Sequence, residues 1–157
     1  MIELVPMSEE SFQKGFKTWI ETYADEKVKS GNWDAEGALE RSRLEYGKLL
    51  PDGRKTKGQY VMTIRNESER TDVGMLWFGI LKEGDLQGAY IWDFRIEDEH
   101  RGKGYGKQAL AVLDKMLRKL GIERVSLHVF GHNRIAISLY EKMGYEITNV
   151  VMSKKLE

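Results

Sequence analysis

The sequence contains no cysteine. This absence excludes disulfide bonds, thiolate metal ligands and any catalytic mechanism with a covalent intermediate on a cysteine. It also gives no indication of secretion, since small secreted domains often depend on disulfides.

An excess of charge of one sign and long apolar runs are also missing. Lysine plus arginine number 25, aspartate plus glutamate number 25, and the formal net charge is zero. We therefore expect no overall field that attracts nucleic acid or an anionic membrane. No apolar run approaches the roughly 20 residues of a membrane span, and the first residues lack the regions of a signal peptide. A cytoplasmic protein without a nucleic-acid or membrane partner is expected.

Hydrophobic residues make up 41% of the 157 residues and aromatic residues 10%, which predicts one folded domain over residues 1–157. After a short N-terminal strand, helical spacing of apolar residues predicts helices over 8–30, 34–49, 109–120 and 134–143. β-branched and aromatic residues, or alternating apolar and polar residues, predict strands over 59–64, 73–81, 89–96, 125–129 and 145–155. This order predicts a mixed sheet flanked by helices, with 89–96 and 125–129 parallel and joined by a crossover.

Residues 101–108, Arg-Gly-Lys-Gly-Tyr-Gly-Lys-Gln, lie between a predicted strand and a predicted helix. Glycines allow close backbone approach, and the following helix offers unpaired N–H groups, so this loop is suited to hold a phosphate. A Walker loop is disfavoured, because Gln108 replaces Ser or Thr and Arg101 replaces the first glycine. A dinucleotide loop is disfavoured because Lys107 and Ala109 occupy the positions of its third glycine.

The loop instead resembles the acyl-CoA pyrophosphate loop of the GCN5-related N-acetyltransferase (GNAT) superfamily, [Arg/Gln]-x-x-Gly-x-[Gly/Ala]. A second block of that superfamily, Asn-x-x-Ala-x-x-x-Tyr-x-x-x-Gly-[Phe/Tyr], is matched downstream. The matching residues are Arg101, Gly104 and Gly106, then Asn133, Ala136, Tyr140, Gly144 and Tyr145. The resemblance covers the chain well from about Tyr90 onward, whereas the N-terminal half matches only in the order of its elements.

The resemblance implies an acyl-CoA N-acyltransferase-like α/β fold. Its central sheet is mixed and mostly antiparallel, with about four flanking helices. The two central strands, 89–96 and 124–130, splay apart, and the pantetheine arm of acetyl-CoA binds between them. Residues implied to bind this cosubstrate are Phe94, Arg95, Ile96, Arg101, Gly102, Lys103, Gly104, Tyr105, Gly106, Lys107, Asn133 and Ser138.

Tyr140 has the position that faces the sulfur of CoA in the resembled family, so it is the candidate general acid for the leaving thiolate. Asp93, a lone acid in an aromatic run, is the first candidate for the base, and burial is expected to raise its pKa. A structural role for Asp93 is an equal alternative. Some family members have a glutamate where this chain has Tyr90, so His128 and water also remain candidates.

The predicted function is direct transfer of acetyl from acetyl-CoA to a primary amine. The alternative is a non-catalytic acyl-CoA sensor that has lost the base. The acceptor is a small amine or a protein amino group, and the sequence does not distinguish between polyamines, aminoglycosides and amino acids. Because His100, His128 and His132 lack a ligand spacing, no metal is expected. Homodimerisation is left open.

Overall fold

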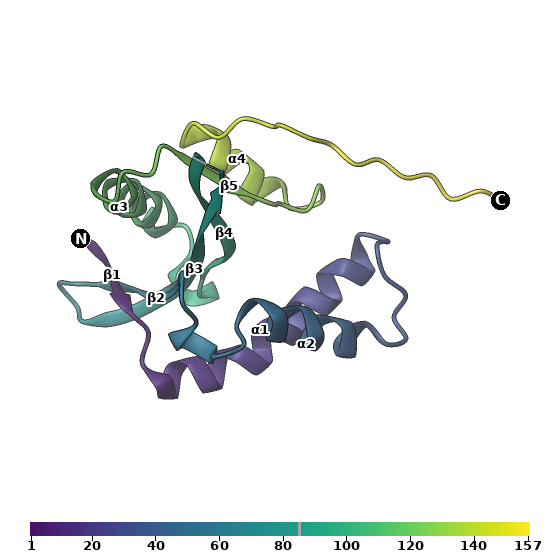
Figure 1. Cartoon of the computed structure of the whole chain (residues 1–157), viewed down its shortest axis with the longest axis horizontal. Coiled ribbons are helices and arrows are strands. Elements are labelled where there is room, and N and C mark those ends of the chain that lie inside the picture. Colours follow the sequence, from purple (N-terminus) through teal and green to yellow (C-terminus); the bar gives the residue numbers. More distant parts are fainter. Residues whose placement is uncertain (85) are drawn as a thin grey trace.

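The computed structural model describes residues 1–84 and 86–157 (Figure 1). Its strands are β1 (Ile2–Pro6), β2 (Gln59–Asn66), β3 (Thr71–Glu83), β4 (Leu86–Ile96) and β5 (Arg124–Leu127). Its helices are α1 (Glu9–Lys29), α2 (Ala38–Leu49), α3 (Tyr105–Lys119) and α4 (Arg134–Lys142), with short 3-10 turns at Gly53–Lys55 and Asp98–His100. No helix in the described ranges is long and apolar enough to cross a membrane.

The five strands form one sheet in the order β1-β2-β3-β4-β5. Strands β1 to β4 pair antiparallel with one another, and β5 pairs parallel with β4. The parallel pairing runs only from Gly88 opposite Arg124 to Ile91 opposite Leu127. Since β4 continues to Ile96, the two strands diverge beyond Ile91. The predicted mixed sheet with splayed central strands is therefore confirmed.

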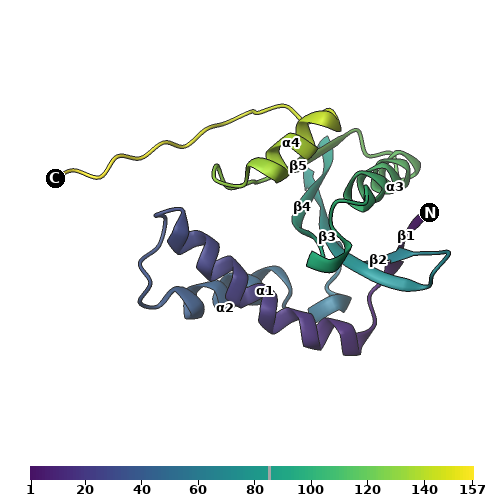
Figure 2. The same ribbon diagram turned by 180° about the vertical axis from the view of Figure 1, so that it is seen from behind.

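The helices cover the two faces of the sheet in pairs, α1 with α2 on one face and α3 with α4 on the other (Figures 1 and 2). On the α3 face, Leu110 and Leu113 are fully buried against sheet residues such as Leu76 and Phe78. On the α1 face, aromatic side chains dominate the core, namely Phe12, Trp19, Tyr46 and Trp77.

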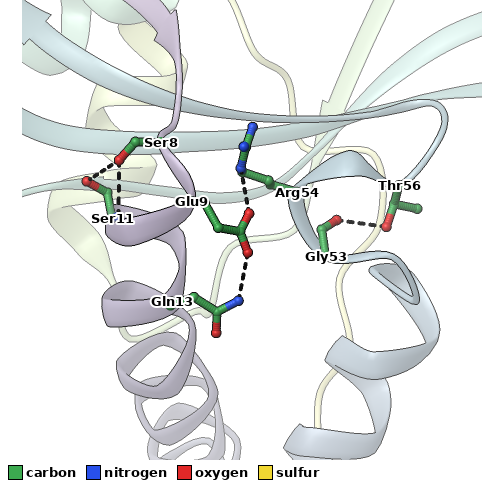
Figure 3. Close-up of polar contacts among 7 residues, drawn as sticks. All are labelled: Ser8, Glu9, Ser11, Gln13, Gly53, Arg54 and Thr56. Carbon is green, nitrogen blue, oxygen red and sulfur yellow. Dashed lines mark hydrogen bonds and ion pairs between the residues drawn. The ribbon is translucent and has the colours of Figure 1, made fainter.

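Helix α1 begins at a polar cap that also ties it to the turn before β2 (Figure 3). The Ser8 hydroxyl accepts a hydrogen bond from the Ser11 N–H at 3.1 Å, which satisfies one unpaired donor of the first turn. Glu9 pairs with Arg54 at 2.6 Å. Hydrogen bonds from Gln13 and then Arg54 lower the pKa of the Glu9 carboxyl.

The C-terminal segment departs from the sequence prediction. We expected a strand over 145–155, but residues 145–157 form no strand, and the end of the chain extends away from the sheet (Figures 1 and 2). Large apolar side chains are exposed along the segment, namely Ile147, Val150, Val151, Met152 and Leu156. β-branched composition gives the segment an extended conformation, but a strand also needs a partner edge.

Candidate active site

The loop between β4 and α3 has the backbone of an anion-binding site. Gly102 and Gly104 have left-handed φ angles of 75° and 81°, which glycine adopts without steric cost. Gly104 is the N-cap of α3, and no side chain accepts a hydrogen bond there. The N–H groups of the first helical turn therefore point out of the helix end without a side-chain acceptor, where they and the helix dipole favour an anion.

Side chains of the loop mostly hold the loop itself. The Arg101 Nε atom donates to the Ile96 carbonyl oxygen at 2.9 Å, and Arg101 also pairs with Asp98 at 3.0 Å. Tyr105 turns back to the sheet, where its hydroxyl accepts a hydrogen bond from Asn66 at 3.0 Å. Lys103 and Lys107 are exposed to solvent. The backbone and these two lysines thus remain available to an anion.

Gly106 has a packing role. A Cβ atom at this position would lie 3.2 Å from Leu139 Cδ2 and 3.5 Å from Phe94 Cζ. These contacts are tight, so glycine lets the start of α3 approach both β4 and α4. The glycine loop, the diverging end of β4 and α4 are therefore held next to one another.

A β-bulge in β4 sets the direction of the side chains at the gap. Phe78 lies opposite Ile91 but Trp77 lies opposite Asp93, so Trp92 is the extra residue. Ile91 and Phe94 pack on the α3 face of the sheet, whereas Trp92 packs on the α1 face. The bulge brings Asp93 to the α1 face as well, next to Tyr46 of α2.

Asp93 is not the lone acid that we expected from the sequence. Its two carboxylate oxygens accept hydrogen bonds from Arg95 Nε at 2.9 Å and Arg95 Nη2 at 2.8 Å. The Tyr46 hydroxyl lies 3.5 Å from Oδ2, and only 11% of the Asp93 side chain is exposed. The buried carboxylate therefore has a charged partner two residues along the same strand face. Burial, followed by the Asp93 charge, raises the pKa of Tyr46 above its usual range.

Tyr140 lies on the other face of the sheet, near the end of β4. Its ring packs against Phe94 and Tyr145, with centroid separations of 6.4 and 5.6 Å. Burial, and next the negative charge of Asp93, raise the pKa of Tyr140 to about 12. The phenol therefore stays protonated throughout the physiological pH range.

The segment after β5 forms the opposite side of the gap. Burial, and then the nearby Lys27, lower the pKa of His128, so its imidazole is neutral at neutral pH. Glu26 at the end of α1 contacts His132, and Tyr23 packs against Phe130. Helix α1 thus closes one side of the opening through contacts that the sequence alone did not indicate.

The two remaining residues expected to bind the cosubstrate lie on α4. Asn133 caps the helix, accepting a hydrogen bond from the Ala136 N–H at 3.2 Å, and Ser138 is exposed. Among residues 1–84 and 86–157, no group of three or more histidine, aspartate or glutamate side chains is arranged to hold a metal ion.

Comparison with known proteins identifies the family. Residues 16–145 match the Acetyltransferase (GNAT) family. The chain belongs to this family. It is 44% identical to the uncharacterized N-acetyltransferase YycN of Bacillus subtilis, over 99% of both chains, and 37% identical to YdgE of the same organism, over 98% of this chain and 97% of YdgE. The crystal structure of YycN matches 100% of this GNAT chain and 99% of its own, with a TM-score of 0.95.

A more local similarity connects this GNAT protein with a relative of stated activity. It is 33% identical to the spermine/spermidine N(1)-acetyltransferase of Bacillus subtilis over 79 residues, which are 47% of this chain and 52% of that protein. Membership of the GNAT family implies the use of acetyl-CoA. The described geometry fits such a cosubstrate, because an uncapped helix N-terminus and a gap between β4 and β5 lie side by side.

Proposed function

We propose that residues 1–157 act as one N-acetyltransferase domain that moves an acetyl group from acetyl-CoA directly to a primary amine. The observation that carries the proposal is the gap between β4 and β5. The glycine loop follows the end of β4; Tyr140 packs against Phe94 on one face of the sheet, and Asp93 contacts Tyr46 on the other. Acetyl-CoA and the amine, entering from opposite faces of the sheet, would meet at this gap.

Acetyl-CoA supplies the acetyl group as a thioester when it is bound. The N–H groups of 102–107 and the exposed Lys103 and Lys107 hold its pyrophosphate. Backbone groups of Phe94, Arg95 and Ile96, beyond the last pairing with β5, hydrogen-bond the amide-rich pantetheine arm. Asn133 and Ser138 at the start of α4 provide further polar contacts to the same molecule.

Tyr140 assists departure of the thiolate. A phenol whose pKa is about 12 remains protonated, so its hydroxyl can donate a hydrogen bond to the developing negative charge on sulfur. A thiol has a reference pKa of about 8.5, so complete proton transfer from this phenol is uphill. The main contribution of Tyr140 is therefore hydrogen-bond donation in the transition state, with transfer following as the thiolate leaves.

Asp93 is our first candidate for the group that receives the proton of the amine. An ionised carboxylate has about four acceptor sites, and Arg95 occupies two of them. Asp93 can therefore also bind an ammonium group and orient it before the proton is lost. His128 is the alternative base, supported by its lowered pKa, which keeps the imidazole neutral and able to accept a proton.

We propose a basic acceptor, either a small molecule or a protein amino group. The carboxylates of Asp93 and Glu26 lie on the face of the sheet covered by α1 and α2, and they favour a cation. The local similarity to a spermine/spermidine acetyltransferase supports including polyamines among the first acceptors tested. The ring of Trp33 is not available to bind a cationic acceptor, because the Arg41 guanidinium already lies 4.4 Å from its centroid.

The experiment that tests this function is a screen of amine pools for release of CoA thiol from acetyl-CoA. Because the chain contains no cysteine, a thiol-reactive dye reports CoA without a background from the protein. Thermal melts with acetyl-CoA, CoA, ATP and NAD accompany the screen, since a ligand that binds only the native state raises the melting temperature. We expect stabilisation by the two CoA compounds alone and turnover with at least one amine pool.

The melts and the screen distinguish the alternatives. Stabilisation by CoA without turnover on any amine would favour the acyl-CoA sensor. Stabilisation by ATP and not by CoA would contradict the proposed function.

A further inference from the structure

Asn66, the last residue of β2, is polar and yet buried. Only 6% of it is exposed, and it pairs with Ile2 of β1 on one side and with Thr71 of β3 on the other. The sheet therefore fixes the position of its backbone. A buried carboxamide is costly unless its donors and acceptors are paired, so the partners of this side chain indicate what it does.

The two ends of the Asn66 carboxamide have different partners. Its Oδ1 atom accepts hydrogen bonds from the N–H groups of Ser68 at 3.1 Å and Glu69 at 3.4 Å, in the turn between β2 and β3. Its Nδ2 atom donates to the hydroxyl oxygen of Tyr105 at 3.0 Å. Because backbone N–H groups can only donate, they require the oxygen of the carboxamide, and the NH2 group must then face Tyr105. The turn thus fixes the direction in which Asn66 holds the phenol.

Tyr105 connects this anchor to the glycine loop. It is the first residue of α3 and follows the N-cap Gly104 directly. The helical pattern starts with a hydrogen bond of 3.1 Å from the Gln108 N–H to the Gly104 carbonyl oxygen. The N–H groups of residues 104–107 therefore have no acceptor within the helix, and that of Tyr105 is one of them. The hydrogen bond from Asn66 thus holds a residue whose own backbone belongs to the proposed pyrophosphate site.

The rest of the loop depends on anchors at its two ends. At the start, the Arg101 Nε atom donates to the Ile96 carbonyl oxygen at 2.9 Å. The middle has little packing around it, since a Cβ atom on Gly102 would meet nothing within 4 Å beyond its chain neighbours. At the far end, Tyr105 packs against the core and is held by Asn66. The anchor at Tyr105 therefore limits how far the first turn of α3 can move.

We propose that Asn66 is a positioning residue for acetyl-CoA, which acts through the Tyr105 hydroxyl to hold the first turn of α3 in the conformation that binds pyrophosphate. This inference rests on the proposed function, because it assumes that the turn meets the pyrophosphate. Without the hydrogen bond, the N–H groups of the turn would have to be ordered when the cosubstrate binds, which lowers affinity. Neither side chain takes part in the acetyl transfer itself. The affinity for acetyl-CoA should thus depend on this pair, whereas the rate at saturation should not.

The first test is Tyr105→Phe, which keeps the ring and removes the hydroxyl. The Kd for acetyl-CoA, measured by calorimetry, should rise about threefold to tenfold, the range that corresponds to the loss of one neutral hydrogen bond. The KM for acetyl-CoA should rise as well, with kcat unchanged. Tyr60→Phe is the matched control, because it removes a hydroxyl near the other end of β2, and it should change neither Kd nor kcat. Wild-type affinity in Tyr105→Phe would overturn the proposal.

A shorter donor separates positioning from a general loss of structure. S-Acetylpantetheine carries the thioester and the pantetheine arm but lacks the pyrophosphate. Wild type and Tyr105→Phe should therefore have the same kcat/KM with this donor, although they differ with acetyl-CoA. Equal losses with both donors would make the hydrogen bond a purely structural contact and would overturn the proposal.

A double-mutant cycle tests whether Asn66 acts through Tyr105. Asn66→Ala frees two N–H groups that lie in an exposed turn, where water can replace the lost acceptor. Alone, it should weaken acetyl-CoA binding as Tyr105→Phe does; combined with Tyr105→Phe, it should cause no further loss, because the shared hydrogen bond is already absent. Additive losses would overturn the proposal. A wild-type chain that does not bind acetyl-CoA would contradict the proposed function and this inference with it.

Discussion

At the scale of single residues, the candidate chemistry depends on two side chains that approach one gap from opposite faces of a sheet. A β-bulge at Trp92 directs Asp93 to the α1 face, whereas Tyr140 lies against Phe94 on the α3 face. Burial, and next the negative charge of Asp93, raise the pKa of Tyr140. Substitutions at these two positions therefore test separate parts of the proposed reaction.

Tyr140→Phe keeps the ring and removes the hydroxyl. Acetyl-CoA affinity and melting temperature should change little, whereas turnover should fall by about 10² to 10⁴, the usual contribution of a general acid. Tyr145→Phe is the matched control, because the Tyr145 hydroxyl is buried without a hydrogen-bond partner in the described part of the chain. Stopped-flow measurement of the chemical step decides the question. Full turnover in a folded Tyr140→Phe variant would make Tyr140 a packing residue.

Asp93→Asn should lower turnover most near neutral pH and less at high pH, where more of the amine is already deprotonated. The substitution also leaves the half-buried Arg95 without its ion pair, so the melting temperature should fall too. The pH dependence of the rate separates the two effects, because a purely structural loss would lower the rate equally at each pH. A profile parallel to wild type would leave His128 or water as the base.

At the scale of elements, the sequence predicted the helices and most strands because their signals are local. The apolar stripe of α3 and the glycine after it need no information from the rest of the chain. The Asp93–Arg95 pair was not predicted, although residues two apart in a strand share a face of the sheet. The contact of Tyr46 with Asp93 could not be predicted from local sequence, because it joins positions 47 apart in the chain. A strand was predicted over 145–155 because β-branched composition favours an extended conformation, but composition does not indicate whether a partner strand is present.

The end of β4 that borders the site depends on a glycine in the adjacent strand. A Cβ atom at Gly74 would overlap the carbonyl oxygen of Arg95 and lie 3.1 Å from Ile96 Cα. Gly74→Ala should therefore displace backbone that we expect to bind pantetheine, weakening acetyl-CoA binding and lowering the melting temperature. Gly47→Ala is the control: Gly47 lies inside α2 with open space around it, so alanine should stabilise by roughly 0.5–1 kcal/mol. Unchanged acetyl-CoA affinity in Gly74→Ala, measured by calorimetry, would contradict this account.

At the scale of the whole molecule, the sheet separates a face with the glycine loop from a face with carboxylates and aromatic rings. Both faces bury phenols: burial is the main cause that raises the pKa values of Tyr23, Tyr46, Tyr140 and Tyr145 above the usual tyrosine value. In the unfolded chain these groups titrate near pH 10. Between pH 10 and the higher pKa values of the native state, the unfolded chain therefore binds fewer protons than the native protein.

This difference determines the direction in which stability changes at alkaline pH. The free energy of unfolding should be unaffected by these phenols below about pH 10 and should fall as the pH rises above it, since the native state must keep protons that the unfolded chain releases. Urea unfolding at pH 9, 10 and 11, with tyrosinate absorption recorded in parallel, measures both quantities. Tyr145→Phe should reduce the alkaline loss, because it removes one of the buried phenols. If all tyrosines ionise near pH 10 while the protein stays folded and equally stable, the phenols are accessible to water and the raised pKa of Tyr140 cannot explain why it would remain a hydrogen-bond donor.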